Sequence, residues 1–395
     1  MFENKTVVIG IGGGIAAYKT AYLASRLAKT GADVHVIMTK NACNFINPIT
    51  FETLTGNKCL VDTFDRNFEF NVEHVALAKR ADVFIIAPAT ADVIAKTACG
   101  IADDMLTTTF LAAKCEKIVA PAMNTAMYEN PVTQDNLDRL RSYGVRVLEP
   151  AEGYLACGDT GKGKMPEPEE LFAAVEKAVA REKDMKGLKV IVTAGATRES
   201  LDPVRFITNH SSGKMGAALA KECMLRGANV VLVKAFTTAK MPDFVRTENV
   251  ESAEDMFNAV RAGFDDADIV IMAAAVSDYT PDTFSDEKIK KSDDDMSISL
   301  KRTQDILKYM GEHKTHQFLC GFSMETQNMI ENSVKKLKKK NADMIVANNL
   351  KDAGSGFGTD TNAVVIITKD NEEALSLMTK EEVAHEIVNR ILALR

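Results

Sequence analysis

The sequence predicts an α/β protein with two doubly wound, Rossmann-like domains. Its 395 residues exceed what one ordinary hydrophobic core accommodates. A strand that runs into a glycine turn, then a helix, then a second strand occurs once near residue 6 and again near residue 188. Between the two occurrences, residues 180–187 are charged and lack apolar periodicity, so we expect domains at 1–184 and 185–395.

In the first domain, the apolar run 6–10 predicts a buried strand, and the glycine run 12–14 turns the chain. Residues 15–29 have helical spacing, and Gly31 ends that helix. The run 34–38 predicts the next strand, which completes a βαβ unit. Apolar runs predict further strands at 83–87, 117–120 and 145–148.

The second domain begins with an apolar run, 188–195, that also ends in glycine. After a long loop, residues 212–226 are expected to form a helix, which Gly227 ends, and 230–233 is the next strand. Apolar runs predict further strands at 269–273, 317–320, 344–347 and 363–367.

The composition excludes several classes of protein. A net charge of −7 argues against a nucleic-acid binder, which would carry a basic surface. No apolar run reaches the ~20 residues of a membrane-spanning helix, and the early first strand leaves no room for a signal peptide. Seven scattered cysteines without a CxxC pair favour reduced thiols, so we expect a cytoplasmic protein.

The glycine-rich loop after the first strand is expected to point backbone N–H groups at an anion. A dinucleotide site would place an acidic residue at the end of the second strand, where this chain has Met38 and Thr39. This favours a mononucleotide such as FMN, and an NAD-linked reductase is the alternative.

Two side chains of the first domain are candidates for chemistry. Asn124 follows a strand that should be buried, and an amide in a packed interior needs partners. Cys157 lies beside Gly158, close to Gly161 and Gly163, where a flexible backbone would let the thiol move onto a ligand. A helix cap and an inert thiol are the respective alternatives.

Six segments of the first domain match, in order, one family pattern: IAAYK at 15–19, HVALA at 74–78, APATA at 87–91, GIADD at 100–104, PAMN at 121–124 and LACG at 155–158. Residues 1–180 thereby resemble the FMN-dependent phosphopantothenoylcysteine decarboxylases, which implies a flavodoxin-like FMN domain. The resemblance implies FMN contacts from Gly13, Gly14, Ile15, Thr39, Thr90, Ala91, Asp92 and Ala122. The chain departs from the family at Gly12, where Ser or Thr is usual, at Asp92, usually Asn, and at Tyr128, usually Trp.

The chemistry of that family gives three residues of this chain a role. The flavin oxidises the thiol-bearing carbon of the substrate to a thioaldehyde, the neighbouring carboxylate leaves as CO2, and the reduced flavin returns the hydride to the enethiolate. The resemblance implies that His74 is the base near the thiol and that Asn124 holds the carboxylate. Cys157 would protonate the enethiolate carbon.

In the second domain, residues 208–216 combine Ser, Gly and Lys at a helix start, which is typical of an anion-binding loop. The segment is not a Walker loop. Two lysine clusters follow, at 288–291 and 335–340, and helical spacing puts Lys336 and Lys340 on one face. A solvated surface is the alternative for either cluster alone, but in an acidic protein such clusters often bind a polyphosphate.

These segments, with GF at 321–322, ANN at 347–349 and GFG at 356–358, resemble the phosphopantothenate–cysteine ligases over residues 188–370. The resemblance implies a CTP-dependent ligation through an acyl-cytidylate, with Mg²⁺ carried by the triphosphate and no metal ligand named in the chain. Asn209 and Lys288 would be catalytic. CTP contacts are implied for Asp278, Lys288, Thr303, Gln304, Asp305, Ile306, Phe322, Lys336 and Lys340. The family often has Asn-Pro in place of Thr303-Gln304, and a small-Gly-Pro turn at 234–236.

Together the two resemblances imply a bifunctional enzyme of coenzyme A synthesis that acts on 4′-phosphopantothenate, L-cysteine and CTP and binds no nucleic acid or membrane. They also imply homo-oligomers, with trimeric flavin domains and dimeric ligase domains. Two alternatives are a flavin decarboxylase of C-terminal peptide cysteines, against which the ligase half argues, and a non-catalytic regulatory flavoprotein, against which His74 and Asn124 argue.

Overall fold

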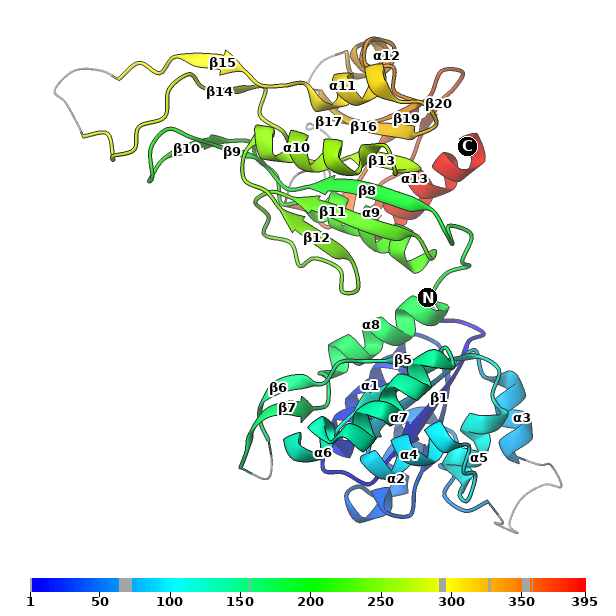
Figure 1. Cartoon of the computed structure of the whole chain (residues 1–395). Coiled ribbons are helices and arrows are strands. Elements are labelled where there is room, and N and C mark those ends of the chain that lie inside the picture. The colour runs from blue at the N-terminus through cyan, green and yellow to red at the C-terminus, as the bar shows by residue number, and fades with distance from the viewer. Residues whose placement is uncertain are drawn as a thin grey trace. The chain divides into compact units, whose positions relative to one another are not determined.

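The computed structural model describes residues 2–63, 73–155, 158–290, 296–325, 328–349, 356 and 358–395. The chain folds into two units, Met1–Arg181 and Glu182–Arg395. Each unit is built around its own sheet of mainly parallel strands (Figure 1).

The sheet of the first unit has five parallel strands in the order β2-β1-β3-β4-β5. This is the flavodoxin-like order, in which a ligand site forms beyond the carboxyl ends of the strands, where the strand order reverses between β1 and β3. The strands are β1 (Thr6–Ile11), β2 (Asp33–Met38), β3 (Val83–Ala89), β4 (Glu116–Pro121) and β5 (Arg146–Val147).

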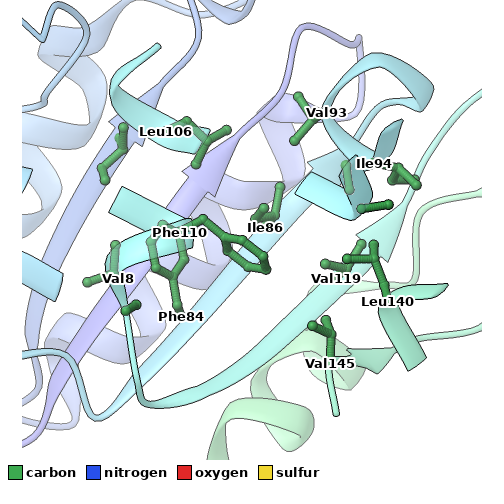
Figure 2. Close-up of a cluster of buried hydrophobic side chains, with 14 of the residues drawn as sticks. Val8, Phe84, Ile86, Val93, Ile94, Leu106, Phe110, Val119, Leu140 and Val145 are labelled. Carbon is green, nitrogen blue, oxygen red and sulfur yellow. The ribbon is translucent and has the colours of Figure 1, made fainter. Parts of the chain in front are cut away.

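Helices cover this sheet because its strands are apolar on both faces, and every residue of β3 is buried. Figure 2 shows part of the resulting core, in which the rings of Phe84 and Phe110 meet edge to face at 5.3 Å. The helical elements are α1 (Ala17–Lys29), η1 (Ala42–Asn44), α2 (Pro48–Thr55), α3 (Glu73–Arg80), α4 (Ala91–Cys99), α5 (Met105–Ala112), α6 (Thr125–Glu129), α7 (Pro131–Ser142) and α8 (Pro168–Val179).

A short antiparallel ribbon, β6 (Ala151–Tyr154) and β7 (Thr160–Lys164), follows the sheet and lies next to α6 (Figure 1). No strand was expected here from the sequence, because the segment is short and contains Gly153, Gly161 and Gly163. The backbone N–H of Met123, just after β4, donates to the carbonyl of Gly163 at 3.0 Å, which ties the ribbon to the end of the sheet.

The sheet of the second unit has the order β12-β11-β8-β13-β16-β17-β19-β20. Its first six strands are parallel, and β19 and β20 extend it with antiparallel pairings. The parallel part has the doubly wound order 3-2-1-4-5-6, with a switch point between β8 and β13. The strands are β8 (Lys189–Ala194), β11 (Asn229–Lys234), β12 (Arg246–Asn249), β13 (Ile269–Met272), β16 (Phe318–Glu325), β17 (Met344–Asn349), β19 (Val365–Ile367) and β20 (Glu372–Ala374).

The helices of the second unit are α9 (Lys214–Leu225), α10 (Ala253–Phe264), α11 (Ile306–His313), α12 (Met329–Lys339) and α13 (Lys380–Leu394). Three two-stranded ribbons complete the unit: β9 (Arg198–Ser200) with β10 (Phe206–Thr208), β14 (Tyr279–Pro281) with β15 (Leu300–Arg302), and β18 (Thr361–Asn362) with β21 (Met378–Thr379). In Figure 1, β9–β10 and β14–β15 extend from the same end of the unit. None of the helices in the described ranges is long and apolar enough to cross a membrane.

The prediction of two doubly wound α/β domains is confirmed by both sheets. Each predicted strand has its counterpart, although β5 is limited to Arg146 and Val147. The predicted helix at 15–29 starts two residues later, at Ala17, because Ile15 and Ala16 belong to the turn after β1.

Candidate functional sites

A cavity of about 560 Å³ lies at the carboxyl end of the first sheet. Loops after β1, β2, β3 and β4 form its walls together with the ribbon β6–β7, as expected for a doubly wound fold. The structure brings together in this cavity all the residues predicted to contact FMN: Gly13, Gly14, Ile15, Thr39, Thr90, Ala91, Asp92 and Ala122.

The glycine loop passes very close to its neighbours. A Cβ atom on Gly12 would lie 2.8 Å from the carbonyl oxygen of Pro88, and one on Gly13 would lie 2.5 Å from Cβ of Asn41. The N–H of Gly12 donates to the same Pro88 carbonyl at 2.9 Å. A side chain at Gly12 or Gly13 would require these neighbours to shift, so the two glycines let the loop keep this close path.

Two helices begin at this cavity. Helix α1 begins just after the glycine loop, and α4 begins after Thr90, whose hydroxyl accepts from the N–H of Val93 at 3.5 Å. Helix N-termini and backbone N–H groups favour an anion such as a phosphate. Apolar side chains, among them Met127 and Leu155, line another part of the wall and suit an aromatic ring. The cavity therefore fits a flavin mononucleotide.

Asn124 lines the same cavity and caps α6. Its Oδ1 accepts from the N–H of Ala126 at 2.8 Å, and its Nδ2 donates to Oδ2 of Asp159 at 2.6 Å. The cap fixes the orientation of the amide, so its donor group faces away from α6. Asn124 thus combines the two roles that the sequence left as alternatives, a helix cap and a polar group in the ligand cavity.

Two of the glycines near Cys157, Gly161 and Gly163, also have a role in packing. A Cβ atom on Gly163, whose φ is +140°, would lie 2.3 Å from the carbonyl oxygen of Met123. One on Gly161 would lie 2.8 Å from the side chain of Thr125. The absence of side chains lets β7 pack directly on the segment that carries Asn124.

Two lysines of the cavity wall share one carboxylate. Nζ of Lys19, a residue that is only 8% exposed, lies 2.8 Å from Oε1 of Glu167, and Nζ of Lys164 lies 3.2 Å from the same oxygen. The hydrogen bond from Lys19 lowers the pKa of the Glu167 carboxyl, with a smaller contribution from Lys164. Two ammonium groups against one carboxylate leave this wall positive, which suits an anionic ligand.

Of the other two predicted residues of the first unit, only His74 lies in the described part of the chain. His74 is half-buried on α3, and the described residues that line the cavity do not include it. Cys157 lies outside the described residues.

A second cavity, of about 500 Å³, lies in the second unit beyond the carboxyl ends of β13 and β16, between α11 and α12. It brings together eight of the nine residues predicted to contact CTP: Asp278, Thr303, Gln304, Asp305, Ile306, Phe322, Lys336 and Lys340. Lys339 adds a further cation to the lining, so residues 336–340 contribute a basic wall.

Hydrogen bonds hold the loop before α11 against the end of β13. The hydroxyl of Thr303 donates to the carbonyl of Ser277 at 2.6 Å, and its N–H donates to that of Asp278 at 3.0 Å. Asp305 caps α11 by accepting from the N–H of Lys308 at 3.0 Å. Thr303, where the family often has Asn, therefore helps to hold the cavity wall together.

The basic wall is oriented by its own contacts. Nζ of Lys336 donates to the carbonyl of Phe322 at 2.8 Å, and the ammonium group of Lys340 pairs with the carboxylate of Asp305. Burial lowers the pKa of Lys340, although the carboxylate of Asp278 opposes this shift. A bound polyphosphate would compete with Asp305 for Lys340.

One of the two predicted catalytic residues of the second unit, Asn209, contacts a residue that lines this cavity. Nδ2 of Asn209 donates to the carbonyl of Val276, a cavity residue, at 3.2 Å. Lys288 is exposed in the segment between β14 and β15, outside the residues that line the cavity. The N–H of its neighbour Ile289 donates to buried Asp202 at 3.1 Å, which anchors this segment to the turn between β9 and β10.

Several functional features were not predicted from the sequence: Lys19 with Glu167 and Lys164, and the contact of Asp159 with Asn124. Lys19 ends the IAAYK segment, but its partner Glu167 is 148 residues away in the chain. The spacing of residues in the sequence could therefore not predict this pair. No group of three or more His, Cys, Asp or Glu side chains suited to a metal was found in the described part of the chain.

The folds and cavities define a two-domain protein with a flavin-type unit and a nucleotide-binding unit. Residues 1–180 match the Flavoprotein family, and residues 185–394 match the DNA/pantothenate metabolism flavoprotein C-terminal domain. The chain belongs to the family of coenzyme A biosynthesis bifunctional proteins, known as CoaBC.

Similar proteins include full-length relatives and solved structures of single domains. The CoaBC protein of Bacillus subtilis (strain 168) is 47% identical over 401 residues, which cover 100% of this chain and 98% of that protein. A cysteine/cysteine sulfinic acid decarboxylase from an unknown prokaryotic organism is 46% identical over 356 residues, covering 88% of this chain and 99% of its own. The crystal structure of the C-terminal domain of a CoaBC protein is 44% identical, covers 52% of this chain and 95% of that chain, and has a TM-score of 0.46.

Proposed function

We propose that this chain carries out two consecutive steps of coenzyme A synthesis. The second unit joins 4′-phosphopantothenate to L-cysteine at the expense of CTP, and the first unit decarboxylates the resulting phosphopantothenoylcysteine to 4′-phosphopantetheine. The observation that carries the proposal is the sorting of the predicted residues into two cavities, one suited to FMN and one with a basic wall. Full-length similarity to CoaBC proteins supports it.

In the first unit, FMN supplies the temporary oxidation that gives the substrate an electron sink when it is bound. It would be held by the glycine loop, Thr39, residues 90–92 and Ala122. Nδ2 of Asn124 donates to the substrate carboxylate, because Oδ1 is engaged by the cap of α6. Cys157 donates a proton to the enethiolate carbon after CO2 has left.

His74 acts as the base, and its position outside the cavity lining of its own copy favours a site that a second copy completes. Ile15 and Tyr18 line the cavity and are 58% and 54% exposed, which supports a subunit contact here. We propose a trimer of flavin units with the cofactor at these contacts.

In the second unit, Lys336 and Lys340 bind the phosphates of CTP, and Mg²⁺ accompanies the triphosphate. The phosphopantothenate carboxylate attacks the α-phosphorus and releases pyrophosphate, which gives the acyl-cytidylate. Lys288 assists this step. The cysteine amine then attacks the acyl carbon and releases CMP, assisted by Asn209.

The ribbon β14–β15 and its connection expose apolar side chains, including Tyr279, Phe284 and Leu300. This supports a dimer of ligase units through the ribbon. Cys59, Cys223 and Cys320 are buried free thiols, which supports a reducing, cytoplasmic location. The partners are the small-molecule substrates, without nucleic acid or membrane.

The test is reconstitution with purified protein. HPLC of the released small molecules should give FMN, and incubation with phosphopantothenate, cysteine, CTP and Mg²⁺ should yield phosphopantetheine, CO2, CMP and pyrophosphate. Omitting Mg²⁺ should stop ligation but not the decarboxylation of added phosphopantothenoylcysteine. A colourless protein that FMN does not reconstitute would refute the first activity. Decarboxylation of free cysteine without action on phosphopantothenoylcysteine would assign the flavin unit a different substrate.

A further inference from the structure

Asp159 is a charged residue that the ribbon β6–β7 brings into contact with Asn124. Its Oδ2 accepts from Nδ2 of Asn124 at 2.6 Å. Since a charged acceptor makes a short, strong hydrogen bond, this contact also orients the amide. Oδ1 of Asn124 is engaged by Ala126, so the Asp159 carboxylate lies on the donor side, where a ligand carboxylate would also have to bind.

Backbone contacts fix the position of Asp159. Its carbonyl accepts from the N–H of Leu155 at 2.8 Å, which closes the end of the ribbon. The ribbon is held on the Asn124 segment by the bond from Met123 to Gly163. The carboxylate of Asp159 is therefore held beside Asn124, a residue of the cavity lining, although Asp159 itself is exposed to solvent and is not among the described residues that line the cavity.

We propose that Asp159 is a positioning residue for decarboxylation, which holds the Asn124 amide as a donor and places a fixed negative charge beside the substrate carboxylate. The proposal rests on the proposed role of Asn124. Two carboxylates that accept from one amide nitrogen lie roughly 5 Å apart and repel each other. The repulsion weakens binding of the carboxylated substrate.

The repulsion disappears during the reaction. When the bond between the substrate carbon and its carboxylate breaks, CO2 leaves uncharged, and the electron pair remains on the substrate as the enethiolate. A repulsion that is present in the bound substrate and weaker in the transition state raises the rate of that step. Asp159 therefore favours loss of the carboxylate and discriminates little against phosphopantetheine, which has no carboxylate at this position.

The test compares the FMN-loaded wild-type protein with Asp159→Asn, which keeps the size and an oxygen acceptor but removes the charge. Pre-steady-state reactions over a range of phosphopantothenoylcysteine concentrations give the Kd of the substrate and the maximal rate of CO2 release. We expect Kd to fall about five- to tenfold, with a similar fall in rate, since the exposed position screens the charge. The inhibition constant of phosphopantetheine should stay within twofold.

Two further variants secure the interpretation. Asp159→Ser should show the same selective fall in substrate Kd. Agreement between the two variants would attribute the fall to the lost charge rather than to new contacts made by the introduced amide. Glu152→Gln removes another exposed carboxylate of the same ribbon, one that does not contact Asn124 in the described structure, and should change neither constant. Added salt should narrow the difference in substrate Kd between the wild type and Asp159→Asn, because it screens the charge of Asp159.

The proposal is overturned if substrate and product constants change together in Asp159→Asn, or if the substrate binds more weakly than to the wild type. Failure of the wild-type protein to release CO2 from phosphopantothenoylcysteine is a different result. That outcome would refute the proposed function itself, whereas normal wild-type turnover without the selective shift refutes only the role of Asp159.

Discussion

Lys19 and Glu167 are 148 residues apart in the chain, yet Nζ of one lies 2.8 Å from Oε1 of the other at the wall of the flavin cavity. The contact joins α1, which begins at the glycine loop, to the residue that precedes α8. Since Lys164 of the ribbon β6–β7 approaches the same oxygen, three separate segments of the wall meet at one carboxylate.

We expect Lys19→Met to weaken FMN binding about three- to tenfold, because the wall loses one positive charge and a charge-assisted hydrogen bond at a half-exposed partner. Fluorescence titration of the flavin-free protein with FMN measures the effect. Lys29→Met changes an exposed lysine on the same helix and serves as the control. Equal affinities of all three proteins would show that this pair acts only in folding.

The ion pair of Asp184 and Arg226 predicts a pH-dependent stability of the second unit. The hydrogen bond from Arg226 lowers the pKa of Asp184, and Arg226 is only 7% exposed and also donates to Asn389 on α13 at 2.7 Å. A lowered pKa in the folded state stabilises the protein above the ordinary aspartate pKa of about 3.9, and this contribution is lost as the pH falls through the lowered value.

Asp184→Asn should therefore lower the free energy of unfolding by about 1–2 kcal/mol at pH 7, allowing for partial exposure of the carboxylate, and by much less below about pH 3. Urea unfolding at both pH values measures the difference. Asp266→Asn, a change at an 82% exposed side chain, is the control. A difference that stays constant with pH would contradict the assignment.

Helix α12 offers a matched pair of lysines for the nucleotide cavity. Lys336 lines the cavity, whereas its neighbour Lys335 is 69% exposed and pairs with Glu331 at 2.7 Å. Lys336→Ala should raise the KM for CTP about tenfold or more, because it removes a cation from the basic wall that is proposed to bind the phosphates of CTP. Lys335→Ala should leave KM within twofold. Equal effects of the two changes would place the triphosphate elsewhere.

Cys157→Ser should separate the two halves of the decarboxylation. A serine hydroxyl is a far weaker acid than a thiol, whose pKa is ~8.5, so protonation of the enethiolate should stop. CO2 release should then be limited to about one per bound FMN, because the flavin is not reoxidised. Measuring CO2 and phosphopantetheine in the same reaction checks this. Normal yields of phosphopantetheine from the variant would exclude Cys157 as the acid.

The central strands of both sheets could be predicted because buried parallel strands appear as continuous apolar runs, as in residues 83–87 and 269–273. The ribbons β6–β7 and β14–β15 could not, since three- to five-residue strands with polar or glycine-rich sequences carry no such run. Their pairing depends on contacts with distant segments, as the bond between Met123 and Gly163 shows.

The cavity residues could be predicted where they follow predicted strands or match family segments, as Thr90 and Phe322 do. The charges that complete the sites could not. Glu167 meets Lys19, and Asp159 meets Asn124, only after the chain has folded back, and neither pair has a helical or strand spacing.

The fit of β7 against the Asn124 segment limits where this ribbon can vary. Even a methyl group at position 161 or 163 would meet atoms closer than 3 Å and would lift the strand from its support. Changes that aim to widen the range of accepted substrates should therefore be made at an exposed ribbon position that lines the cavity, such as Tyr154. Libraries that also randomise positions 161 and 163 would consist mostly of proteins in which β7 no longer packs against the segment that carries Asn124.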